Sequence, residues 1–273
     1  MASNPLPSSQ AINFILDGEP VSAVSGETLL QTAQRIGTEI PHLCYKSGLR
    51  ADGNCRACMV EIEGERTLAA SCCRTPTEGM VVNSSGARPR QAQKLVLELL
   101  QSDIAETRYS PTNELDQWLT KLQLGKPLFP GRRQPATDLS HPAIAVNLDA
   151  CIQCTRCLRA CREEQVNNVI GYAGRGSAST IVFDIQDPLG ESSCVACGEC
   201  VQACPTGALM PAKGLGQQAI EKEIDSVCPY CGVGCQLTYH IGDNQIRYLT
   251  GRDGPANNSR LCVKGRYGFD YVH

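Results

Sequence analysis

The sequence predicts an α+β protein made of several small domains rather than one large core. A length of 273 residues is typical of two or three such domains, and segments with the two-residue period of strands alternate with segments of helical period. Only 5% of the residues are aromatic, whereas 17 are cysteine and fall into four separate groups. Few aromatic residues and many thiols together indicate that metal–thiolate bonds replace part of an apolar core.

The cysteines are expected to lie in a reducing compartment, which predicts a cytoplasmic protein. The N-terminal stretch MASNPLPSSQ is polar and lacks the apolar segment of a secretion signal. No run of about 18 apolar residues is present, so no membrane span is predicted. In such a compartment, grouped thiols bind metal more often than they form disulfides. A formal net charge of −3 gives no electrostatic reason to expect nucleic acid as a partner.

Residues 11–84 are predicted to form a small mixed sheet with one helix. The alternating apolar residues of AINFILDGEPVSAV, broken at Asp17-Gly18, predict a β-hairpin. Ser25 is a suitable N-cap for a short helix that ends at Gly37, and VEIEG followed by TLAA predicts two further strands. Five cysteines belong to this unit: Cys44, Cys55, Cys58, Cys72 and Cys73.

The spacing of these cysteines predicts a 2Fe–2S cluster. A long gap, a C-x2-C pair and a distant fourth thiol are typical of the plant-type arrangement, although the first gap is ten residues here rather than four. The glycine-bearing loop LRADGNCRAC lets the backbone approach an inorganic core closely. Zinc is the alternative, but loops of this length and glycine content fit it less well.

Residues 85–142 contain no cysteine and are predicted to form a helical segment and a linker. RQAQKLVLELLQS has the period of an amphipathic helix, and NELDQWLTKLQL predicts a second helix, capped by Asn113 and ending at Gly125. The proline-rich stretch KPLFPGRRQPATDLSHP predicts the linker. His141 is expected to be a surface loop residue.

The strongest pattern lies in residues 143–212. CIQCTRCLRAC and CVACGECVQAC both have the spacing C-x2-C-x2-C-x3-C, which is typical of two-cluster ferredoxins, and the fourth cysteine of each motif there ligates the other cluster. Pro205 follows the second motif as expected, whereas Arg162 follows the first, and GYAGRGSASTIVFD predicts a hairpin between them. One predicted 4Fe–4S site consists of Cys151, Cys154, Cys157 and Cys204. The other consists of Cys194, Cys197, Cys200 and Cys161.

Residues 221–273 contain the fourth group of cysteines, in VCPYCGVGCQLTYH and LCVKG. The preceding AKGLGQQAIEKEID is predicted to be a helical linker. QLTYHIGDNQIRYLTGRDG has two alternating apolar stretches joined at Gly242-Asp243-Asn244, which predicts a β-hairpin. A hairpin of that size returns the last cysteine to the first three, so a further four-thiolate site is expected. Its predicted ligands are Cys228, Cys231, Cys235 and Cys262.

These motifs resemble those of a known family. IPHLCY, GNCRACMVEI and CRTPTEGM are similar to the 2Fe–2S domain shared by the large iron–sulfur subunit of respiratory complex I, iron-only hydrogenases and NAD-linked formate dehydrogenases. This resemblance implies a β-grasp ferredoxin fold. It also selects Cys73, three residues before a proline, as the fourth ligand, and leaves Cys72 as a small apolar residue. VCPYCGVGCQL resembles the N-terminal 4Fe–4S domain of molybdopterin-guanine-dinucleotide oxidoreductases, so Lys264 is expected between that cluster and the pterin.

The order of the domains resembles the front part of the large subunit of soluble, NAD-dependent formate dehydrogenases. The resemblance implies that electrons from formate, oxidised at a molybdenum or tungsten centre on molybdopterin guanine dinucleotide, enter at the Cys228 site. They would pass through the two ferredoxin-type clusters, with the 2Fe–2S centre as a further relay or a branch, to flavin- and NAD-binding diaphorase subunits. The sequence stops nine residues after Lys264, so the pterin and its catalytic part are expected elsewhere.

Two other hypotheses stay open. The chain could be a stand-alone electron-transfer subunit of a dehydrogenase or hydrogenase complex, without catalysis of its own. It could also be a zinc-bound structural or interaction module. Substrate identity rests on family analogy alone.

Overall fold

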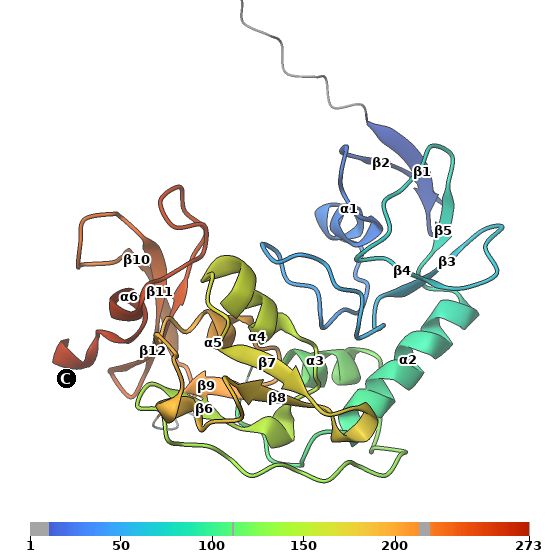
Figure 1. The fold of residues 1–273 in the computed structure, drawn as a ribbon. Helices are drawn as coiled ribbons and strands as arrows, with labels where there is room; N and C mark the ends of the chain where they lie inside the picture. Colours follow the sequence, from blue (N-terminus) through green and yellow to red (C-terminus); the bar gives the residue numbers. More distant parts are fainter. Residues whose placement is uncertain (1–10, 111, 213–218, 273) are drawn as a thin grey trace, which may run out of the picture.

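The structure is a computed structural model and describes residues 11–110, 112–212 and 219–272. Three units that contain β-sheet follow one another along the chain (Figure 1). In the figure, the middle unit of residues 143–212 lies between the N-terminal unit at the upper right and the C-terminal unit at the left. Among the described residues, no helix has both the length and the apolar character needed to cross a bilayer.

A five-stranded sheet in the order β2-β1-β5-β3-β4 forms the N-terminal unit. It is mixed, as predicted, because β5 pairs with β1 in parallel while the other pairs are antiparallel. Asp17 and Gly18 form the turn of the predicted hairpin, both with positive φ. The strands are β1 (Ile12–Leu16), β2 (Glu19–Ala23), β3 (Met59–Ile62), β4 (Ala69–Ala70) and β5 (Val81–Asn83).

Helix α1 (Leu29–Arg35) covers this sheet with Leu29, Leu30 and Ala33, which are fully buried. The prediction of Ser25 as its N-cap is wrong. The cap is Thr28, whose hydroxyl oxygen accepts a hydrogen bond from the Gln31 N–H while the Gln31 side chain accepts one from the Thr28 N–H. This reciprocal pair satisfies two backbone donors at once, which a cap at Ser25 would not do.

Both predicted helices of the next segment are present, as α2 (Ala87–Ser102) and α3 (Glu114–Lys121). Asn113 caps α3 as predicted, because its side-chain oxygen accepts hydrogen bonds from the N–H groups of the first turn. The helix ends before the predicted Gly125, since Gln123 adopts a left-handed conformation. The two helices pack on each other and on residues near Cys44 and Cys154, so the segment is part of a shared core.

The predicted linker is held against the middle unit. Arg132 donates to the carbonyl oxygens of Leu148 at 3.1 Å and Cys151 at 2.6 Å. His141, predicted to be a surface residue, is instead only 7% exposed. Its Nδ1 accepts hydrogen bonds from the N–H groups of Ala143 and Ile144, which a loop histidine in solvent would not need to do.

The middle unit consists of two antiparallel strand pairs and short helices. The hairpin predicted between the two cysteine motifs is present and is formed by β7 and β8. The other pair joins the start of the unit to its end. The elements are β6 (Ile144–Val146), α4 (Arg156–Arg159), a π-helical turn at Ala160–Glu164, β7 (Ile170–Ala173), β8 (Thr180–Phe183), α5 (Glu199–Ala203) and β9 (Leu209–Pro211).

The C-terminal unit is a three-stranded antiparallel sheet of β10 (Lys222–Val227), β11 (Gln236–Gly242) and β12 (Gln245–Gly251), followed by the short helix α6 (Val263–Tyr267). The predicted hairpin corresponds to β11 and β12, which turn at Asp243 and Asn244. The prediction of a helical linker is wrong where the structure describes it, because β10 pairs along its length with β11. Residues 213–218 of that stretch lie outside the described residues.

Candidate iron–sulfur cluster sites

The eight cysteines of the repeated motifs line two cavities in the middle unit. Each cavity takes three cysteines from one motif and the fourth from the other, which is the crossed grouping that the sequence predicted. The two cavities are alike in size. One set is Cys151, Cys154, Cys157 and Cys204, and the other is Cys161, Cys194, Cys197 and Cys200.

The loops around these cavities curl in the same way in both halves. Gln153 and Thr155 in the first loop, and Ala196 and Gly198 in the second, have φ between 54 and 73°. The curl aims backbone N–H groups inward, so that the N–H of Gln153 lies 3.4 Å from the Cys151 sulfur and Ala196 repeats this contact in the second loop. Non-glycine residues in this conformation cost about 1–3 kcal/mol each and are retained where function requires them. N–H groups directed at ligand sulfurs raise the potential of an iron–sulfur cluster.

The thiols in both cavities are buried, which raises their pKa and disfavours the free thiolate. Burial raises the pKa of Cys151 to about 11 and that of Cys154 to about 12. Burial likewise raises the pKa of Cys157 and Cys200. Iron would supply the positive charge that these buried sulfurs need in order to ionise, so cluster insertion would release protons.

The sulfurs surround a space instead of meeting at one point. Among the described residues, no group of three His, Cys, Asp or Glu side chains is arranged to hold a single metal ion. Tetrahedral zinc requires all its sulfur ligands within about 2.3 Å of one ion, whereas a polynuclear core fills the space between thiolates. In the middle unit, four thiols line each cavity, as the ligands of a polynuclear core would.

In the N-terminal unit the structure brings the five thiols close together, and the Cys73 sulfur lies 3.6 Å from that of Cys72. The N–H of Cys44 donates to the Cys55 sulfur at 3.3 Å, and the Cys72 thiol lies near those of Cys44 and Cys58. Cys72 is fully buried, whereas Cys73 is exposed. Cys72 is thus the more buried of two neighbouring thiols at this site, and the choice of Cys73 that the family resemblance makes stays a prediction.

The fourth predicted site lies at the surface of the C-terminal unit. Its four cysteines line one cavity together with Lys264, which follows the last of them by two residues. Cys231 and Cys262 are exposed, unlike the ligands of the middle unit. Exposed apolar side chains adjoin the site, with Tyr230 41% and Val233 56% exposed. The lining cysteines are Cys228, Cys231, Cys235 and Cys262.

Buried arginines join neighbouring sites, and the sequence analysis missed them. Arg159, only 1% exposed, donates from Nη2 to the carbonyl oxygens of Cys44 at 2.6 Å and Cys154 at 3.3 Å. It therefore links the N-terminal cysteine loop to that of the first cavity. Arg156 is 2% exposed and forms a bidentate pair with Glu114, at 2.7 and 2.8 Å. Their position inside CTRCLRAC was the only available signal, because the partners lie far away in the sequence.

Three family models match separate parts of the chain. A 2Fe-2S iron-sulfur cluster binding domain matches residues 9–86, a 4Fe-4S dicluster domain matches 150–208, and a molybdopterin oxidoreductase Fe4S4 domain matches 221–273. The first and last ranges include the sheets of the N-terminal and C-terminal units, and the middle range lies within the unit of residues 143–212 and includes β7 and β8. Their order along the chain is that of the motifs in the sequence.

Similar proteins belong to several kinds of oxidoreductase. A component of an NADH-quinone oxidoreductase of Rhizobium meliloti (strain 1021) is 33% identical over 96% of this chain and 31% of its own length. A protein of Staphylococcus haemolyticus (strain JCSC1435), provisionally named a formate dehydrogenase, is 25% identical over 94% of this chain and 31% of its own. The chain spans about a third of the length of these curated relatives.

One solved structure has a similar fold. It is an NAD+-reducing [NiFe]-hydrogenase in the H2-reduced state, with a TM-score of 0.70 and 28% identity over 77% of this chain and 92% of that chain. Sequence matches and fold thus agree with the grouping of the cysteines. The chain carries the iron–sulfur domains found in the group of proteins that includes NADH-quinone oxidoreductases, NAD-reducing hydrogenases and molybdopterin oxidoreductases.

Proposed function

We propose that this chain conducts electrons through one 2Fe–2S and three 4Fe–4S clusters in a formate dehydrogenase that reduces NAD. The observation that carries the electron-transfer role is the grouping of cysteines around three cavities, four thiols to each. We assign all sixteen grouped cysteines as ligands, with Cys72 replacing Cys73 in the first site. The protein keeps the clusters apart from water and tunes their potentials through burial and hydrogen bonds.

The contacts between sites support a single line of relays and disfavour a branch. Arg159 contacts the carbonyl oxygens of Cys44 and Cys154, so the N-terminal site adjoins the Cys151 site. The crossed cysteines make the two sites of the middle unit direct neighbours. Arg266, in the C-terminal unit, donates to the carbonyl of Cys197, which supports the Cys228 site as next in order. The 2Fe–2S centre is then the relay at the far end from the Cys228 site.

Formate as the electron donor is supported by the C-terminal unit. It matches a molybdopterin oxidoreductase domain, and Lys264 lines the cysteine cavity where it could contact a pterin. A molybdopterin guanine dinucleotide with molybdenum or tungsten, bound outside this chain's described residues, would supply the two-electron oxidation of formate. Flavin- and NAD-binding subunits would receive the electrons at the 2Fe–2S end.

A second candidate is a stand-alone electron-transfer subunit of a hydrogenase complex. The similar chain of the NAD+-reducing [NiFe]-hydrogenase matches this chain over 92% of its own length, which supports a role in such a complex. In this alternative the Cys228 site would receive electrons from another metal centre.

Iron and acid-labile sulfide analysis of the anaerobically purified chain tests the proposal. Four clusters hold about fourteen iron and about fourteen sulfide atoms per chain, whereas zinc sites contain no inorganic sulfide. Electron paramagnetic resonance of the reduced chain should show one 2Fe–2S and three 4Fe–4S signals. In the complete complex, the appearance of these signals after addition of formate, but not after addition of hydrogen, supports the dehydrogenase. The reverse result supports the hydrogenase subunit.

A further inference from the structure

The contact between the middle and C-terminal units centres on one buried arginine. Arg266, whose side chain is 3% exposed, lies in α6 shortly after Cys262. Its backbone N–H donates to the Cys262 carbonyl oxygen at 3.0 Å, and its Nε–H donates to the Cys197 carbonyl oxygen at 2.8 Å. One residue thus forms hydrogen bonds with proposed ligand residues of two different clusters.

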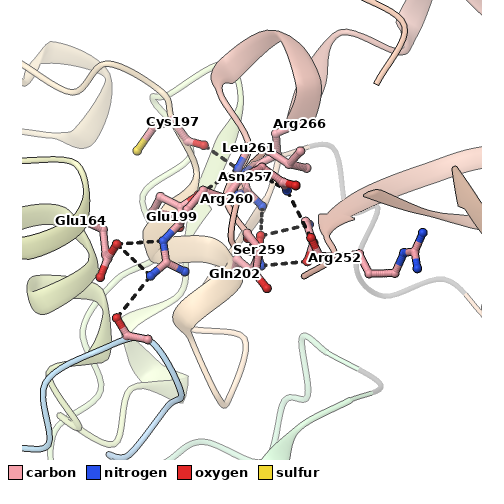
Figure 2. Close-up of polar contacts among 12 residues, drawn as sticks. Glu164, Cys197, Glu199, Gln202, Arg252, Asn257, Ser259, Arg260, Leu261 and Arg266 are labelled. Atoms are coloured by element: carbon pink, nitrogen blue, oxygen red, sulfur yellow. Dashed lines mark hydrogen bonds and ion pairs between the residues drawn. The ribbon is translucent and has the colours of Figure 1, made fainter. Parts of the chain in front are cut away.

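The two other nitrogens of the guanidinium also have hydrogen-bond partners (Figure 2). Nη2 donates to Glu199 at 2.7 Å, and Nη1 donates to Gln202 at 2.7 Å. The Glu199 side chain is 7% exposed and also faces Arg260, 3.6 Å away. Arg260 also forms an ion pair with Glu164, at a distance of 2.8 Å. Every nitrogen of the Arg266 side chain has a partner, so its position is determined by more contacts than packing alone requires.

The backbone of the second cluster loop is shaped to admit this side chain. Gly198, which follows Cys197, has φ +73°. A Cβ on it would lie 2.2 Å from Cδ of Arg266 and 2.4 Å from the hydroxyl oxygen of Tyr267. Any residue other than glycine would therefore both strain the loop and push the arginine away. The loop and the arginine depend on each other.

We infer that Arg266 is a positioning residue for electron transfer between the Cys228–Cys262 site and the Cys194–Cys200 site. It fixes the two ligand loops relative to each other through the hydrogen-bonded route Cys262–Arg266–Cys197, and its positive charge raises the reduction potential of the Cys194–Cys200 cluster. The inference rests on the proposed electron-transfer function. The charge effect follows because reduction adds negative charge to a cluster, and net charge and hydrogen bonding set its potential.

Three variants of the full, cluster-loaded chain test this inference. R266Q removes the charge, R266K keeps the charge but loses the planar fork and the Nε donor, and R252Q is the matched control. Arg252 is an arginine of the same unit whose side chain is 41% exposed and pairs loosely with Asp225 at 3.5 Å. Its guanidinium points away from the other labelled residues in Figure 2. The readouts are the midpoint potential of each cluster by electron paramagnetic resonance and the rate of electron exchange between clusters after rapid reduction.

We expect R266Q to shift the potential of the Cys194–Cys200 cluster to a more negative value and to slow exchange with the Cys228–Cys262 cluster. R266K should keep the potential and slow the exchange, and R252Q should match the wild type in both. Unchanged values in R266Q, or an equal shift in R252Q, would overturn the inference. If R266Q loses its clusters, an unchanged exchange rate in R266K overturns it. A wild-type chain without iron and sulfide would refute the proposed function itself, which separates the two failures.

Discussion

Replacing Cys72 with alanine is expected to remove the 2Fe–2S cluster, whereas replacing Cys73 with alanine is expected to leave it in place. Cys72 is fully buried, and its thiol lies near those of Cys44 and Cys58. Cys73 is exposed, and its sulfur lies 3.6 Å from that of Cys72 on the side of Gly53.

The size of the effect follows from the cluster content. The 2Fe–2S centre holds about two of about fourteen irons, so C72A should lose roughly one seventh of the iron and sulfide of the wild type. C73A should lose none. The two variants are each other's control, because both remove one sulfur from neighbouring positions.

Iron and sulfide counts together with the 2Fe–2S signal in electron paramagnetic resonance measure this directly. The three 4Fe–4S signals should persist in both variants, which shows that the remaining clusters still assemble. Loss of the 2Fe–2S signal in C73A, with or without loss in C72A, would refute the structural reasoning. The family spacing would then determine the ligand, and the local backbone would differ from the one described.

Three further predictions concern the middle unit and α1. C204A should lose about four irons and the signal of the Cys151 site, while the signal of the Cys194 site persists. Iron analysis and spectroscopy of C204A beside C161A can check this. R159M should lower the free energy of unfolding by on the order of 3 kcal/mol in denaturant titrations, because charge-assisted hydrogen bonds to buried carbonyls are lost; unchanged stability would contradict this. The pKa of Glu27 is lowered from 4.5 to about 2, mainly by its hydrogen bond with Arg35. The resulting stabilisation is complete above pH 4.5 and is lost as the pH falls toward 2. This stabilisation amounts to only about 0.2–1 kcal/mol because the pair is partly exposed. The pH dependence of the free energy of unfolding of E27Q should therefore lack this contribution.

The grouping of the cysteines of the middle unit around two cavities could be predicted from the sequence because it depends on local spacing. Three cysteines at intervals of three residues must curl around a common space, and the repeat supplied the crossed fourth ligand. The hairpins and the Asn113 cap also depend on neighbours only a few residues apart, so their patterns are visible in the sequence.

The remaining features depend on partners that are distant in the chain. Strand β10 forms because β11 offers it an edge, although the sequence of β10 also suits a helix. Arg159 binds the carbonyl of Cys44, 115 residues away. The family spacing selects Cys73, whereas the greater burial of Cys72 depends on how the folded backbone turns two adjacent side chains.

The charges of the buried arginines bear on how the chain assembles. Arg156 and Arg266 each have a carboxylate partner, Glu114 and Glu199. Arg159 donates only to carbonyl oxygens, and no carboxylate pairs with it in the part of the chain that the structure describes. A buried cation without an anion is costly, but clusters bound by thiolates carry negative charge and would lie on both sides of Arg159. The clusters would therefore supply its missing counter-charge, so the junction between the N-terminal and middle units should reach full stability only when both sites are filled.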